Sequence, residues 1–205
     1  MMNNKRWLLS ALLFAATTYA LGQATPTQER HSQEHSTAAT QSLDQKSQAG
    51  ALLQIVRQST ERFKDVSVAE KEGYALAFGC VSGPDAGAMG LHFVNGALLD
   101  EVNKTGVLDA TRPQIVIYEP TADGKLRLIG ADYVVFADSW NARHPEGTPQ
   151  LMGQLFHLFE TPNRFGLPAF FTLHVWAWKE NPNGAFVNWH PNVSCQNFAG
   201  QSNTP

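Results

Sequence analysis

The chain has 205 residues, of which 16% are charged and 43% are hydrophobic, and its formal net charge is −3. This composition is typical of one globular domain with short appendages, and it excludes a wholly disordered chain, a collagen and a coiled coil. The slightly acidic balance does not favour a basic nucleic-acid-binding surface, so we expect no nucleic-acid partner.

The N-terminus has the pattern of a secretory signal peptide. Lys5 and Arg6 precede an apolar run of about ten residues, which is too short to span a membrane. We therefore predict a signal peptide over residues 1–22, a secreted or periplasmic location, and no stable membrane span after cleavage. Residues 23–47 are almost all polar and are predicted to form a disordered leader. Residues 48–205 then form a single globular domain.

Cys80 and Cys195 are the only cysteines in the sequence. An exported chain enters an oxidising compartment, where an even number of cysteines indicates pairing. We therefore predict one disulfide bond between them. The alternative is a free thiolate that serves as a metal ligand or nucleophile, but neither residue lies in a CxxC motif.

The first part of the predicted domain is helical. Apolar residues recur at helical spacing over residues 48–64. A second helix is predicted from Ser67, which begins a capping-box pattern, to Phe78, with Gly79 as its C-terminal cap. The glycine-rich segment 79–90 is expected to be a loop that either approaches another group closely or forms a set of turns.

The rest of the domain is predicted to be mainly β-structure. Apolar and β-branched runs predict strands, a helical turn is expected over 97–103, and residues 151–160 have the apolar spacing of a helix. The predicted strands are 88–94, 114–119, 125–137 and 169–178. The fold class is therefore α+β, a largely antiparallel twisted sheet with N-terminal helices packed on it. A small β-barrel with flanking helices is the alternative.

The strand predicted over residues 169–178 carries residues suited to a binding pocket. Period-two alternation places His174, Trp176 and Trp178 on the same face. We expect the two indole rings to form a cofactor- or ligand-binding wall beside His174. The alternative is that His174 is a structural histidine, hydrogen-bonded within an aromatic core.

Two further predicted strands each carry one residue that could join His174. His92 and His174 are predicted metal ligands, and Glu119 is predicted to be either a third ligand or a catalytic acid or base. His190 is a candidate fourth ligand. Two imidazoles and a carboxylate suit a divalent transition metal such as zinc, copper or iron. The alternatives are structural histidines and a carboxylate that faces solvent.

Asp132 and Tyr133 occupy adjacent positions in another predicted strand. Alternation sends them to opposite faces, so only one of them can line the same cavity as the histidines. The sequence contains no GxSxG elbow, no P-loop and no GxGxxG motif, which disfavours phosphoryl transfer and dinucleotide-dependent hydride transfer. The sequence identifies no particular reaction.

Four segments resemble an uncharacterised family of exported bacterial proteins. The resemblance covers most of residues 65–195. Its segments are GCVSGPDAGAMGLHFVN (79–95), IYEP (117–120), FGLPAFFTLHVWAWKENPNGAF (165–186) and NVSC (192–195). The resemblance implies export and a single domain, and it implies no activity and no functional residue.

The leading hypothesis is a secreted or periplasmic metal-binding protein, with an oxidoreductase as one form of that function. The second hypothesis is a non-enzymatic module whose aromatic pocket binds a small molecule. The third is a structural protein of the cell envelope. Metal analysis tests the first hypothesis. A tryptophan-fluorescence response to a ligand that survives chelation favours the second over the first, and a compact monomer with no concave pocket favours the third.

Overall fold

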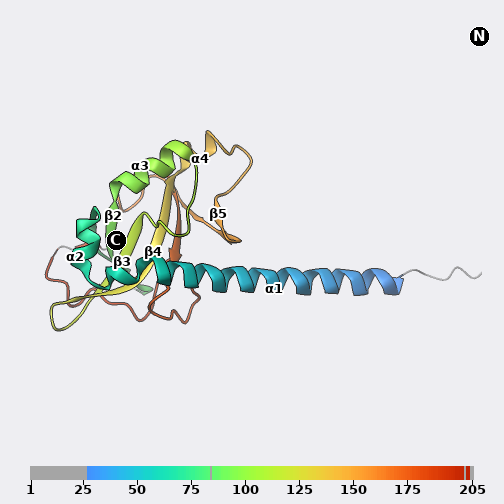
Figure 1. Ribbon diagram of the computed structural model, residues 1–205, viewed down its shortest axis with the longest axis horizontal. Helices are drawn as coiled ribbons and strands as arrows, with labels where there is room; N and C mark the ends of the chain where they lie inside the picture. Colours follow the sequence, from blue (N-terminus) through green and yellow to red (C-terminus); the bar gives the residue numbers. More distant parts are fainter. Residues whose placement is uncertain (1–26, 84, 201, 204–205) are drawn as a thin grey trace, which may run out of the picture. The chain divides into compact units, whose positions relative to one another are not determined.

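The computed structural model describes residues 27–83, 85–200 and 202–203 (Figure 1). The chain divides into two compact units, residues 1–40 and 41–205. In the first unit, the described part is helical. The predicted signal peptide, residues 1–22, lies outside the described residues. Within the described ranges, no helix combines the length and the apolar character that a membrane span requires.

The second unit is built on one sheet whose strand order is β7-β8-β4-β3-β2-β1-β9. Every neighbouring pair is antiparallel except β1 and the two-residue β9, which run parallel. The strands are β1 Tyr74–Gly83, β2 Gly87–Asn95, β3 Ile115–Pro120, β4 Leu126–Phe136, β7 His157–Phe159, β8 Phe170–Val175 and β9 Ser202–Asn203. The predicted α+β fold with a largely antiparallel sheet is therefore confirmed.

The helices are α1 Thr27–Thr60, the 3-10 helix η1 Glu61–Lys64, α2 Val66–Lys71, α3 Gly96–Thr105 and α4 Ala137–Asn141. Helix α1 includes most of the helix predicted over 48–64, and its Leu52 and Val56 are fully buried in a hydrophobic cluster with Leu173 of β8. Helix α1 also includes residues 27–47, which we predicted to be disordered. That segment contains no glycine or proline, so nothing in its sequence breaks a helix.

The prediction of a long second helix is wrong. Helix α2 has only six residues, and its N-cap is Asp65, whose carboxylate accepts a hydrogen bond from the backbone N–H of Ser67 at 3.0 Å. Phe78 and Gly79 have φ values of 63° and 66° and lie at a β-bulge in β1. Most of the expected loop 79–90 therefore belongs to β1 and β2 instead.

The predicted helix over 151–160 is also wrong. The segment forms β7 and a separate hairpin of two short strands, β5 Gln150–Leu151 and β6 Gln154–Leu155. Met152 and Gly153 form the hairpin turn with φ values of 47° and 75°, which no helix accommodates. A short apolar run of this kind has no period that distinguishes a helix from paired strands.

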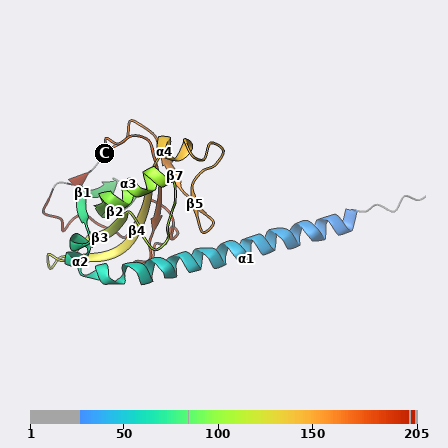
Figure 2. The same cartoon turned by 45° about the horizontal axis from the view of Figure 1, so that its top comes forward.

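The two faces of the sheet have different surroundings. On one face, Tyr133 and Leu173 pack with the buried residues of α1, and Tyr118 packs with Phe63 of η1. On the other face, buried side chains include His92, Asp132 and His174. The central strands curve strongly (Figure 2), so residues on distant strands converge over this second face.

The predicted disulfide is present. Cys80 of β1 is bonded to Cys195 in the C-terminal segment, with a Cα–Cα distance of 5.7 Å. The same segment pairs with the sheet through Ala88 and His190, which exchange backbone hydrogen bonds at 3.1 and 3.2 Å. The end of the chain is therefore fixed across the beginning of β2.

Candidate metal centre

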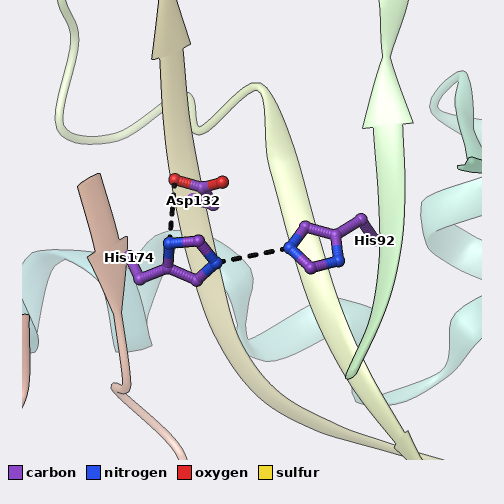
Figure 3. Close-up of side chains that lie close together, drawn as sticks. All are labelled: His92, Asp132 and His174. Atoms are coloured by element: carbon purple, nitrogen blue, oxygen red, sulfur yellow. Dashed lines mark hydrogen bonds and ion pairs between the residues drawn. The ribbon is translucent and has the colours of Figure 1, made fainter. Parts of the chain in front are cut away.

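His92, Asp132 and His174 come together on the second face of the sheet (Figure 3). Asp132 of β4 and His174 of β8 are direct cross-strand partners. His92 of β2 is opposite Ile117 of the intervening strand β3. On a flat sheet His92 and His174 would be separated by three strand spacings, about 14 Å between backbones, so the curvature of the sheet is what lets their rings meet.

The donor atoms of this group are close to one another. His92 Nε2 lies 3.3 Å from His174 Nε2, and His174 Nδ1 lies 3.7 Å from Asp132 Oδ1. The hydroxyl of Thr172 donates a hydrogen bond of 2.6 Å to the same carboxylate oxygen. One ligand atom from each of the three ionisable residues can be chosen so that all three lie within 4.8 Å.

Burial determines the protonation states of the group. Removal from water, together with the neighbouring His174, lowers the pKa of His92 to about 4. Burial also lowers the pKa of His174 to about 3, and it raises the pKa of Asp132 to about 6. Both imidazoles are therefore neutral near pH 7, which is the form that binds metals.

The two imidazoles have unused hydrogen-bonding capacity. Among the described residues, neither His92 Nδ1 nor His174 Nδ1 has a hydrogen-bond partner at ordinary distance and angle. Weaker interactions with the backbone of Gly90 and the side chain of Asn188 favour protonation of the rings, but they do not offset the effect of burial.

A cavity of about 130 Å³ lies beside the group. His92, Asp132, Thr172 and His174 are its polar lining residues, and the rest of its wall is apolar. The apolar wall includes Phe78, Phe136, Phe159, Phe165 and Phe170. The three ionisable residues are therefore next to a space that a small molecule can enter.

Glu119 lies outside the group formed by His92, Asp132 and His174. Its carboxylate accepts a hydrogen bond of 2.7 Å from Lys179 and is paired with Arg127, and the backbone N–H of Ser194 lies 3.3 Å from it. The structure does not bring Glu119 into the group formed by the two histidines, and Asp132 contributes the carboxylate there instead. Two cationic partners already neutralise Glu119, so it acts as an anchor for the C-terminal segment.

Glu119→Gln is expected to lower the free energy of unfolding by about 2 kcal/mol, because Lys179 would lose its partner in a partly buried position. Desolvation raises the pKa of Glu119, but the hydrogen bonds from Lys179 and Arg127 outweigh it and hold the pKa below 4.5. The contribution of Glu119 is therefore complete above about pH 4.5, and it is lost as the pH falls through the lowered pKa.

Urea unfolding at pH 7 and at pH 3 measures this effect. The destabilisation at pH 7 should shrink at pH 3, because the stabilisation from a carboxyl group with a lowered pKa falls once the pH is below its ordinary pKa of 4.5. Glu160→Gln, which removes an exposed carboxylate, is the matched control and should change stability little. An equal effect of Glu119→Gln at both pH values would contradict the ion-pair explanation.

His190 and Trp176 are buried but do not join the group. Trp176 lies between the rings of His174 and His190, at centroid distances of 5.8 and 5.0 Å. The indole N–H of Trp176 donates a hydrogen bond of 2.6 Å to the carbonyl of Val187. His190 Nδ1 accepts a hydrogen bond from the backbone N–H of Asn192. Trp176 therefore packs against the ring of His174, and it separates His190 from His92 and His174.

Trp178 lies on the opposite side of the sheet. Strand β8 ends at Val175, so period-two alternation does not continue to Trp178. Its indole N–H donates to the hydroxyl of Thr60 at 3.0 Å, and Lys64 lies 4.0 Å from the ring centroid. Neither Trp176 nor Trp178 lines the cavity, whose aromatic wall consists of phenylalanines. The aromatic wall that we predicted to consist of tryptophans therefore consists of phenylalanines.

Sequence reasoning considered Asp132 as a cavity residue but not as a ligand. A usable signal was present, because Asp132 lies in the middle of the apolar strand β4, where an unpartnered carboxylate is costly. Glu119, at the end of its strand, gave the same signal, and the local sequence did not distinguish the two.

Together, the fold and the site define a disulfide-linked α+β protein with a buried His/Asp/His group beside an apolar cavity. Comparisons with protein-family models, with curated proteins and with solved structures each gave no match. The functional argument therefore rests on the geometry of this site.

Proposed function

We propose that this chain is an exported metal-binding protein in which His92, Asp132 and His174 hold one transition-metal ion. The observation that carries the proposal is the convergence of three ligand atoms within 4.8 Å in the protein interior. A bound cation would compensate the burial of these polar and ionisable groups.

The separation of the two imidazoles supports this proposal. Two nitrogens bound at about 2.0–2.1 Å to a tetrahedral zinc ion lie about 3.4 Å apart. The Nε2 atoms of His92 and His174 are 3.3 Å apart, so little movement is needed for both to bind one ion. A site with two histidines and a carboxylate leaves positions for water or a substrate, as in catalytic zinc sites and non-haem iron sites. Oxidoreductase chemistry would require iron or copper in this position.

Asp132 has two roles available to it. It can be the third ligand, or it can accept a hydrogen bond from His174 Nδ1 and orient that ring, since the two atoms are 3.7 Å apart. The second arrangement is common around metal-bound histidines. In either role, the hydrogen bond from Thr172 fixes the position of the carboxylate.

The disulfide supports the exported part of the proposal. Disulfides persist in extracellular and periplasmic compartments and are rare in the reducing cytosol. The bond between Cys80 and Cys195 is therefore in keeping with secretion through the signal peptide proposed for residues 1–22.

The test is to load untagged, chelator-treated protein separately with zinc, copper and ferrous iron, and to measure bound metal by mass spectrometry. We expect one ion per chain. At a free metal concentration 100 times the dissociation constant, binding should stabilise the fold by about 2.7 kcal/mol. For a protein of this size, that corresponds to a rise in Tm of about 5–10 °C.

His92→Ala and His174→Ala should each abolish stoichiometric loading, and the matched control is His157→Ala. His157 is exposed on β7 and is not part of the group. If the double variant His92→Ala/His174→Ala binds as much metal as the wild type, or if no metal binds under any of these conditions, the proposal is wrong.

Asp132→Asn distinguishes the two roles of the carboxylate, because the amide keeps the size of the side chain. Loss of an orienting partner typically weakens metal binding about 10- to 100-fold. A larger loss is expected if the carboxylate is a ligand, since the neutral amide is a much poorer donor. Competition with a chelator of known affinity measures the change.

A further inference from the structure

The cavity beside the metal site has features of a ligand pocket. Its volume of about 130 Å³ is close to that of an engineered protein cavity of about 150 Å³ that binds benzene. Its four polar lining residues, among them His92 and Asp132, are buried, whereas Phe78 and Phe165 are only half-buried. The half-buried phenylalanines therefore mark the side of the cavity nearest the solvent, which we call its mouth.

The mouth of the cavity is built from four contacting aromatic rings. Phe165 makes edge contacts with Phe78, Phe159 and Phe170 at centroid distances of 5.3, 6.0 and 5.9 Å. Phe159 and Phe170 are stacked at 5.2 Å. These rings come from β1, β7, β8 and the loop before β8.

The backbone around Phe78 is unusual for a bulky residue. Phe78 has a φ of 63°, which is the left-handed region that non-glycine residues rarely adopt. It lies at the register shift between Ala77 and Cys80 in β1. Backbone strain of this kind is found at ligand-binding sites, where the side chain must have a particular direction. Here the bulge coincides with a ring that lines the cavity.

We propose that this cavity binds a small uncharged molecule of one aromatic ring, with a single hydroxyl group directed at His92, Asp132 and His174. The inference rests on the proposed function, because the same three side chains would hold the metal and receive the polar group. Phenylalanine walls recognise the ring through apolar contact and ring-edge geometry. In the metal-free protein, a charged group would lose its hydration against these walls, so charged analogues are excluded from that form. Simple phenols have this chemistry.

The experiment measures binding of 4-fluorophenol by ¹⁹F NMR, to chelator-treated protein and to zinc-loaded protein. We expect saturable binding of 4-fluorophenol, and, in the metal-free protein, at least tenfold weaker binding of 4-fluorobenzoate, whose carboxylate is charged at pH 7. Leu99→Phe should weaken binding at least tenfold, because Leu99 of α3 lines the cavity and the larger side chain would fill it. Leu98→Phe is the matched control, since Leu98 packs against a different cluster.

A second variant, Leu167→Trp, blocks the cavity from its half-buried mouth and provides the same test if Leu99→Phe does not fold. The inference is overturned if 4-fluorophenol shows no saturable binding to either form of the protein. It is also overturned if both cavity-filling variants bind 4-fluorophenol as well as the wild type, or if the metal-free wild type binds 4-fluorobenzoate as tightly as 4-fluorophenol. Binding to metal-free protein supports the pocket even if no metal ever loads. A protein that loads zinc but ignores the probe retains the proposed function and loses this inference.

Discussion

Removal of the disulfide is expected to lower the free energy of unfolding by about 4–5 kcal/mol, which is a large part of the stability of a typical domain. The bond joins cysteines 115 positions apart, and the entropy that such a cross-link removes from the unfolded chain grows with loop length. The bond also holds the C-terminal segment, whose Ser194 contacts Glu119 and whose His190 pairs with β2.

Urea unfolding of Cys80→Ala/Cys195→Ala measures the effect. Alanine is the appropriate replacement because Cys80 is fully buried, and serine would introduce a buried hydroxyl group. The wild-type protein in reductant should approach the midpoint of the double variant. The double variant itself should not respond to reductant, which serves as the control. Equal stability of the wild type with and without reductant would contradict the prediction.

Gly90→Ala is expected to destabilise the protein by about 4 kcal/mol, or to prevent folding. Gly90 has a φ of 89°, which costs a non-glycine residue about 1–3 kcal/mol. A Cβ atom at this position would also lie 2.6 Å from the carbonyl oxygen of Tyr118 on β3, which is a backbone atom that cannot move away easily. Gly90 precedes His92 by two residues in β2, so this close approach also fixes the strand that carries the histidine.

Gly124→Ala is the matched control for the conformational cost of placing a Cβ atom at a positive φ. Gly124 has a similar φ of 77°, but a Cβ atom there would meet no atom within 4 Å. Its replacement should therefore cost only the conformational penalty of about 1–3 kcal/mol. Chemical unfolding of both variants isolates the steric contribution of Gly90 as their difference. If both variants lose the same amount of stability, the close contact with β3 does not contribute to the destabilisation by Gly90→Ala.

Much of the sheet could be predicted from local patterns. The runs that became β2, β3, β4 and β8 are rich in apolar and β-branched residues, and they were predicted to within a few residues at each end. The helix predicted over 151–160 failed because a short apolar run has no clear period. The second helix failed because Asp65, rather than Ser67, caps α2, and the bulge at Phe78 extends β1 through a glycine-rich segment.

The candidate site was only partly predictable. Each histidine could be selected by its position in an apolar strand, but strand order and curvature decided which side chains meet. Glu119 and Asp132 were both carboxylates in apolar strands, and Asp132 faces His174 only because β4 and β8 pair in one particular register. Glu119 is neutralised instead by Lys179, which is far away in the sequence, and by Arg127, which lies across a turn.

The sequence alone therefore determined the α+β class, the central strands and the pairing of Cys80 with Cys195, and it selected the two histidines that the structure brings together. The strands, the fold class and the choice of histidines depend on residue type and on spacing along the chain, which are local properties. The disulfide follows from the presence of two cysteines. Only the tertiary structure decided that Asp132 joins His92 and His174, and that phenylalanines rather than tryptophans enclose the cavity. Those choices depend on strand register, on bulges and on the curvature of the sheet, which arise from contacts between residues far apart in the chain.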